Sequence, residues 1–210
     1  QCAASGINEH GVHEVLWYER PLEDIRHQDN TNDRLLLRFG AVDYHARVWI
    51  DGQFVGEHRG GHVPFDLDIS DAMNFDGTGG PKRLTVRVFD SAHDLTQPRG
   101  KQYWGPKPED IFYTPSSGIW QSVWLESVPR LRIADSSHGT IIRSNNIDEG
   151  IIDARIAVLG RRTQEACYIE LEVSLAGLKV SSSGRKDILP HEDFTRFKHS
   201  MRLSPCLLYT

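Results

Sequence analysis

Residues 39–69 read F-G-A-V-D-Y-H-A-R-V-W-I-D-G-Q-F-V-G-E-H-R-G-G-H-V-P-F-D-L-D-I, and this stretch decides the fold class. Near its centre, Asp51-Gly52 separates the apolar triplet 48–50 from the segment 53–55. An Asp-Gly pair accepts the positive φ angles that a two-residue hairpin turn requires. Further along, residues 63–69 alternate apolar with other side chains, which is the period of a half-buried strand. The stretch therefore predicts a β-hairpin followed by another strand.

The sequence on both sides of this stretch also favours strands. No segment carries an apolar stripe at helical spacing over ten or more residues, and we expect only a short helical turn at 71–73 with Ser70 as its N-cap. Short strands joined by Gly, Pro and Asp turns are typical of a β-sandwich or jelly roll. The additional strands expected are 15–18, 35–42, 84–88 and 123–128.

A change in composition near residue 130 indicates a domain boundary. All five tryptophans precede residue 125, and Val128-Pro129 ends the aromatic part, so we expect domains at 1–130 and 131–210. In the second part, residues 151–159 and 167–175 alternate, and a third strand is expected to start at Leu178. Three strands are too few for an immunoglobulin-like sandwich, which needs about seven. The second domain is therefore expected to be incomplete.

The last part of the chain has a different character. Residues 190–210 show no clear period, and Cys206–Thr210 resembles the translation of a sequencing-library adapter. We expect an irregular tail whose end is an assembly artefact. The sequence opens with Gln1 and has no cationic-then-apolar leader, which leads us to expect a processed chain or a fragment. No signal in the sequence assigns a compartment.

Composition excludes several functions. The 210 residues have a net charge of −5 and no clustered basic face, which argues against nucleic acid as a partner. No apolar run approaches the ~18 residues of a membrane span. The three widely spaced cysteines form neither a zinc pattern nor a disulfide framework, so we interpret them as incidental thiols.

We expect no catalytic residue, no cofactor and no metal site in this chain. The sequence contains no G-x-S-x-G, G-x-G-x-x-G or P-loop motif. His58 and His62 have the spacing of two ligands on a helix, but Gly60-Gly61 between them argues against a helix. Glu170 and Glu172 lie two apart on an expected strand, and we interpret them as a solvated strand face.

Three separated motifs together resemble a known family. They are the stretch 39–69, P-R-G-K-Q at 98–102, and Y-T-P-S-S-G-I-W-Q-S-V-W-L-E at 113–126. In this order they resemble the N-terminal sugar-binding domain of glycoside hydrolase family 2, the β-galactosidase and β-glucuronidase group. Residues 131–185 resemble, more weakly, the start of the immunoglobulin-like second domain of that family. The resemblance implies an all-β chain: a jelly-roll (galactose-binding-like) β-sandwich followed by a truncated immunoglobulin-like β-sandwich.

The resemblance also implies what the chain does. The family hydrolyses terminal β-linked sugars with retention, using two glutamates of a (β/α)₈ barrel about 5 Å apart. That catalytic domain has no counterpart here, so the expected function is the non-catalytic sugar-binding part. The expected partners are a carbohydrate of the β-galactoside or β-glucuronide type and the missing (β/α)₈ catalytic domain. Two alternatives stay open: a free-standing carbohydrate-binding module and a structural interaction domain.

Two places are expected to face a sugar. In the family, the polar residue at the position of Asp43 reaches into the active site and holds a sugar hydroxyl, and Tyr44 follows it directly. A carboxylate suits this role because its two acceptor oxygens can grip vicinal hydroxyls. The second place is the segment 97–115, which combines aromatic and polar side chains as carbohydrate pockets do. Its candidate substrate-binding residues are Arg99, Lys101, Gln102 and Asp110.

Overall fold

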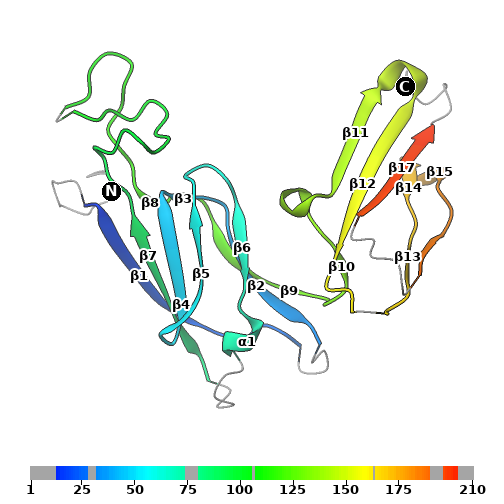
Figure 1. The fold of residues 1–210 in the computed structure, drawn as a ribbon, viewed down its shortest axis with the longest axis horizontal. Coiled ribbons are helices and arrows are strands. Elements are labelled where there is room, and N and C mark those ends of the chain that lie inside the picture. Colours follow the sequence, from blue (N-terminus) through cyan, green and yellow to red (C-terminus); the bar gives the residue numbers. More distant parts are fainter. Residues whose placement is uncertain are drawn as a thin grey trace. The chain divides into compact units, whose positions relative to one another are not determined.

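The chain is almost entirely β-structure and divides into two compact units, residues 1–128 and 129–210, which are described separately (Figure 1). The computed structural model describes residues 13–27, 32–73, 80–105, 107–162, 164–189 and 196–202. No helix in the described ranges is both long and apolar enough to cross a membrane. The all-β class expected from the sequence is thus confirmed.

Two antiparallel sheets make up most of the first unit. One has the strand order β1-β7-β4-β5 and the other the order β6-β2-β9 (Figure 1). The predicted hairpin is confirmed, because β4 and β5 pair across a turn in which Asp51 and Gly52 have φ angles of 47° and 82°. The strands are β1 (Val15–Leu22), β7 (Lys82–Phe89), β4 (His45–Ile50), β5 (Gln53–Arg59), β6 (Phe65–Asp68), β2 (Arg34–Phe39) and β9 (Val123–Val128).

The core of this unit follows from the two-residue period of its strands. Alternate side chains of β2, β4 and β7 point into one apolar cluster, and most of them are at most 2% exposed. Each such Leu, Val, Ile or Phe stabilises the fold by about 1.5–3 kcal/mol relative to an exposed position. The strand members of this cluster are Leu35, Leu37, Phe39, Ala46, Val48, Ile50, Leu84, Val86 and Val88.

The strand predicted at 35–42 is interrupted in the structure. β2 ends at Phe39, and a separate short strand β3 (Val42–Asp43) pairs with β8 (Gly118–Ile119). Gly40 lies at the break, where its N–H donates to the carbonyl of Ser122 at 2.8 Å. A Cβ atom added at Gly40 would lie 2.8 Å from the Cβ atom of Gln121. This close backbone approach separates β3 from β2 and brings Asp43 opposite Gly118.

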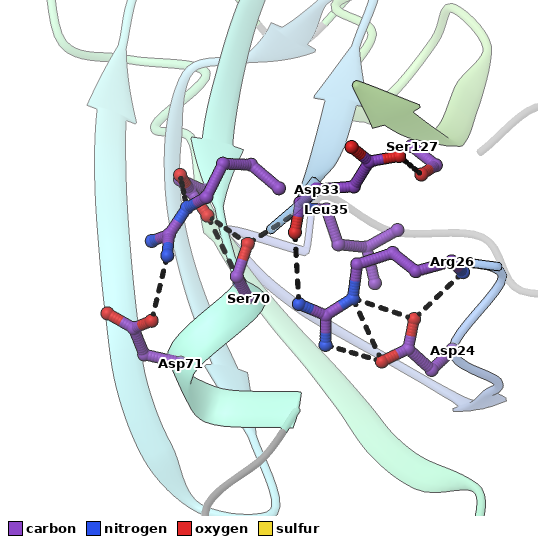
Figure 2. A network of polar contacts seen from close by, with 9 residues as sticks. Asp24, Arg26, Asp33, Leu35, Ser70, Asp71 and Ser127 are labelled. Atoms are coloured by element: carbon purple, nitrogen blue, oxygen red, sulfur yellow. Dashed lines mark hydrogen bonds and ion pairs between the residues drawn. The ribbon is translucent and has the colours of Figure 1, made fainter. Parts of the chain in front are cut away.

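The short helix α1 (Ser70–Met73) corrects the expected N-cap. Ser70 is the first residue of the helix, and its Oγ accepts from the N–H of Leu35 at 2.7 Å (Figure 2). Its own N–H and Oγ both donate to Asp68 Oδ1. Arg34 adds ion pairs to Asp68 and Asp71. Ser70 therefore connects the helix to β2, and the carboxylate of Asp68 is the acceptor that caps the N-terminus of the helix.

Three rings form a stack inside the first unit. Phe39 and Phe65 are directly opposite each other on β2 and β6, with ring centroids 4.6 Å apart. His58 of β5 stacks on the other side of Phe65 at 4.2 Å. The Nδ1 atom of His58 is buried and has no hydrogen-bond partner. Burial lowers the pKa of His58 below its usual value of 6.5.

This burial makes the stability of the first unit depend on pH. Because the folded pKa of His58 is below 6.5, the unfolded chain binds its proton first as the pH falls. The contribution of neutral His58 is thus fully present above pH 6.5 and decreases as the pH falls below that value. We expect urea titrations between pH 7.5 and 5 to show this loss in the wild type and less of it in His58→Phe. Equal pH profiles for the two proteins would contradict the assignment to His58.

The second unit contains eight strands within its described residues, so the expectation of three was wrong. β12 (Ile151–Leu159) is central and pairs with β10, β11 and β17, while β13 pairs with β16 and β14 with β15. Alternate residues Ala154, Ile156 and Val158 pack with Ile169 and Ile188 in one core. The other strands are β10 (Arg132–Ile133), β11 (Ile141–Asn146), β13 (Cys167–Ile169), β14 (Glu172–Leu175), β15 (Leu178–Ser182), β16 (Lys186–Ile188) and β17 (Arg196–Arg202), with 3₁₀ turns at Ser136–His138 and Ile147–Glu149.

Two strands differ from the sequence prediction because of hydrogen bonds that their backbone groups form. The strand expected at 167–175 is split at Leu171, whose N–H and C=O are both bonded to Ser183. β17 lies in the tail that shows no sequence period, and it pairs along seven residues of β12. Pairing along an edge uses backbone groups, so it does not require an alternating apolar pattern. The segments 190–195 and 203–210, including the adapter-like end, lie outside the described residues.

Candidate functional site

Asp43 is a buried carboxylate at the end of the first sandwich, where β3 pairs with β8. It is 5% exposed, and its Oδ2 accepts a hydrogen bond of 3.0 Å from Nε2 of Gln102. The Oδ1 side faces the backbone of Gly61, where an added Cβ would lie 2.4 Å from that oxygen. One oxygen is therefore held by an amide, and the other lies against a position that only glycine can occupy without a shift.

Burial raises the pKa of Asp43 above its usual value of 3.8. The hydrogen bond from Gln102 acts in the opposite direction, the carboxyl group of Asp90 raises the pKa further, and His62 and Arg99 lower it. A raised carboxyl pKa means that the ionised form costs folding free energy at neutral pH.

Gln102 connects Asp43 to the long loop of residues 90–117. While its Nε2 donates to Asp43, its Oε1 accepts from the N–H of Ser116 at 2.6 Å. The side chain is 6% exposed. Next to it, the backbone N–H of Tyr103 donates a hydrogen bond of 2.8 Å to the carbonyl of Tyr113. Gln102 thus fixes the loop to Asp43, and the structure brings these two predicted site residues into direct contact.

Sequence reasoning missed Asp90, a second buried carboxylate at this end of the unit. It is 4% exposed, accepts from Ser117 Oγ at 2.5 Å, and also accepts from the amide of Gln97. These bonds tie the first and last residues of the loop together. The available signal was the position of this acidic residue directly after an apolar strand, β7.

The other predicted site residues are not hydrogen-bonded to the carboxylate of Asp43. Arg99 donates to the carbonyls of Ala92 and Asp94 and so stabilises the turn that precedes Gln102. Lys101 and Asp110 are exposed on the loop. Tyr44 is half-buried, and its carbonyl accepts from the N–H of Gly60. Their role in sugar binding remains a prediction.

The loop carries an aromatic cluster next to its anchor. The rings of Tyr103, Trp104 and Phe112 lie 5.0–5.8 Å apart, and Trp104 is 44% exposed. Tyr103 Oη donates to Glu109 at 3.0 Å, which places a carboxylate beside the exposed rings. Nearer to Asp43, Trp120 Nε1 donates to the carbonyl of Gly61. The arrangement provides aromatic surface on the loop and a buried acid at its base.

Two tryptophans on strands of the first unit, Trp49 and Trp124, differ in their surroundings. Trp49 does pack, against Trp17 and Phe54 with Arg47 over its ring. Trp124 is 45% exposed on β9. It sits on the outer face of an edge strand, where alternation points it away from the core.

Glu170 and Glu172 both form ion pairs with Lys179 at the surface. Lys179 lies 3.7 Å from Glu170 and 2.9 Å from Glu172, and all three side chains are at least 40% exposed. The expectation that both are solvated is confirmed, but the strand expected to carry both is interrupted, and only Glu172 lies in a strand, β14. His58 and His62 are each used in ring contacts, with Phe65 and Trp120 respectively.

Comparison with known proteins defines the class of this chain. A family model described as the sugar-binding domain of glycosyl hydrolases family 2 matches residues 7–129. The fold of the first unit and this match place the chain among the β-sandwich sugar-binding domains. The chain belongs to glycosyl hydrolase family 2.

Relatives agree with this assignment. The chain is 31% identical over 173 residues to a β-glucuronidase of Felis catus, and 31% identical over 186 residues to that of Mus musculus. These matches include 76% and 80% of the chain but only 25% and 27% of the relatives. The chain therefore spans about a quarter of the length of the curated relatives that it matches.

Solved structures share the fold. A β-glucuronidase of Bacteroides uniformis superposes with a TM-score of 0.66 at 23% identity, covering 92% of this chain and 22% of that one. A family 2 glycosyl hydrolase of Bacteroides cellulosilyticus superposes with a TM-score of 0.62 at 17% identity, covering 91% of this chain and 24% of that one.

Proposed function

We propose that this chain is the sugar-binding part of an enzyme that hydrolyses a terminal β-linked sugar with retention, and that the sugar is a β-glucuronide. The names of the curated relatives support the choice of a glucuronide over a galactoside. The two glutamates of such a reaction belong to a catalytic domain outside residues 1–210. This chain contributes one wall of the sugar pocket.

The observation that carries the proposal is the buried, ionisable Asp43. Its raised pKa means that the acid is retained at a cost in stability. Groups kept at such a cost are concentrated at functional sites. With Oδ2 held by Gln102, the carboxylate has a fixed orientation, and Oδ1 is the atom proposed to accept from a sugar hydroxyl.

The burial of Asp43 also bears on the alternative of a free-standing binding module. A carboxylate that is 5% exposed offers little surface to a sugar in this chain alone. Completion of the pocket by the catalytic domain is therefore part of the proposal. Pockets shared between domains are a common location of ligand sites.

The test uses the full-length protein and the variant Asp43→Asn. Asparagine keeps an acceptor for Gln102, so the loop anchor survives, but it loses the charge that strengthens a bond to a sugar hydroxyl. We expect kcat/KM for 4-nitrophenyl β-glucuronide to fall about ten- to hundredfold, the range for a hydrogen bond to a charged group.

Two comparisons separate the parts of this proposal. Asp71→Asn, at an 85% exposed carboxylate on α1, is the matched control and is expected to retain wild-type kinetics. Wild-type kinetics in Asp43→Asn would contradict a sugar contact at Asp43. Faster turnover of the β-galactoside than of the β-glucuronide by the wild type would overturn the choice of sugar, and no turnover of either would overturn the proposed activity.

A further inference from the structure

The two layers of the first unit differ by one strand. The β1 sheet has four strands and the β2 sheet three, and a cleft of about 600 Å³ lies between the terminal strands β1 and β9. Core residues form its floor: Leu37 and Phe39 come from β2, and Leu84 and Val86 from β7. The cleft therefore opens directly into the hydrophobic core.

Both walls of the cleft are strand edges that have no partner strand in the described part of the chain. Within the described residues, β9 pairs only with β2, and β1 pairs only with β7 (Figure 1). A free edge presents unpaired backbone N–H and C=O groups, and folded proteins normally pair or cover such edges. On β9, Val123 and Leu125 pack against the core yet are only partly buried. The cleft thus has the hydrogen-bonding groups and the apolar surface that a further strand would use.

Arg20 adds a charge to this cleft. It is directly opposite Leu84 of the core in the β1–β7 register, so it lies on the inner face of β1. It lines the cleft, is exposed, and has no ion-pair partner among the residues that the structure describes. An inward-facing charge at the rim of an apolar cleft requires an opposite charge when the cleft is covered. The occupant is therefore expected to carry a carboxylate.

The described sheets leave no candidate for this strand within the first unit, and the sequence before β1 is unsuited to it. Residues 1–12 read Q-C-A-A-S-G-I-N-E-H-G-V and show no apolar alternation. The curated relatives are about four times as long as their matched segment, since only 25% to 27% of each is covered.

We propose that an extended segment of a longer polypeptide, outside residues 1–210, adds as a fourth strand to the free edge of β9. Its alternate apolar side chains fill the cleft over Leu37, Phe39, Leu84 and Val86, and a carboxylate of the segment pairs with Arg20. About six residues match the length of β9. The two layers then have four strands each.

The test compares amide hydrogen exchange at residue resolution in the 210-residue chain and in the full-length protein. Strand alternation directs every second amide of β9 toward β2 and the others toward the free edge. In the 210-residue chain we expect only alternate amides of Val123–Val128 to be protected. In the full-length protein we expect protection of all six, with the additional amides slowed at least tenfold.

A charge reversal tests the ion pair. Arg20→Glu in the full-length protein is expected to return the additional β9 amides to fast exchange. Arg59→Glu, the same change at an exposed position on β5 at the opposite edge of the sheet, is the control and is expected to leave them protected.

Two results would overturn the proposal. One is an alternating protection pattern of β9 in the full-length protein. The other is protection of all six amides in the 210-residue chain that increases with protein concentration together with dimer formation, because a second copy would then occupy the cleft.

Discussion

Phe39→Ala is expected to lower the free energy of unfolding of the first unit by about 3–5 kcal/mol, the range for removing a fully buried aromatic side chain. Phe39 is 1% exposed, stacks on Phe65, and contacts the core from the end of β2. Its loss leaves a cavity beneath the ring stack with His58. The cost is large because the facing rings are held by two different strands and cannot collapse into the space.

Urea unfolding followed by tryptophan fluorescence measures this effect. All five tryptophans lie before residue 125, so the signal reports the first unit alone. Phe54→Ala is the matched control, since Phe54 is 47% exposed on β5, and it is expected to cost less than about 1.5 kcal/mol. Equal losses in the two variants would contradict the assignment of Phe39 to the core.

Gly61→Ala is expected to destabilise the first unit by about 1–3 kcal/mol, the usual cost of overpacking. The added Cβ would lie 2.4 Å from Oδ1 and 2.7 Å from Cγ of Asp43. The carboxylate cannot simply swing away, because it is buried and bonded to Gln102. Displacing it also weakens the connection between β3 and the loop of residues 90–117.

A double-mutant cycle isolates this contact. Asp43→Ala alone leaves the buried amide of Gln102 without its acceptor and is expected to cost about 1–3 kcal/mol. In the double variant the alanine Cβ at position 61 has room. The loss in the free energy of unfolding should therefore be smaller than the sum of the losses in the two single variants. Strict additivity in the same urea titrations would show that Gly61 and Asp43 do not contact each other.

The sequence predicted the elements that depend on local pattern. Asp51-Gly52 determined a hairpin, and the alternation in β4 and β7 determined which side chains enter the core. These predictions succeeded because turn dihedrals and strand periodicity are properties of a few adjacent residues. Strand boundaries were less predictable. The break at Gly40 arises from the approach of Gln121, and that at Leu171 from its bonds to Ser183, both far along the chain.

The candidate site shows the same division. A motif in the sequence singled out Asp43 and Gln102 as substrate-binding candidates, but only the structure shows that they are hydrogen-bonded to each other, 59 residues apart. Asp90 went unnoticed because its burial depends on Ser117 and Gln97 of the folded loop. Lys101 and Asp110, chosen from the same segment, remain on its surface.

By itself the sequence determined the class of chain: an all-β protein with the motifs of family 2, in which strand and turn chemistry is written into neighbouring residues. Only the tertiary structure decided that Asp43 is buried between Gly61 and Gln102, and that a cleft opens between β1 and β9. The reason is physical: burial, pKa and unpaired strand edges arise from contacts between distant segments, and no local pattern encodes them.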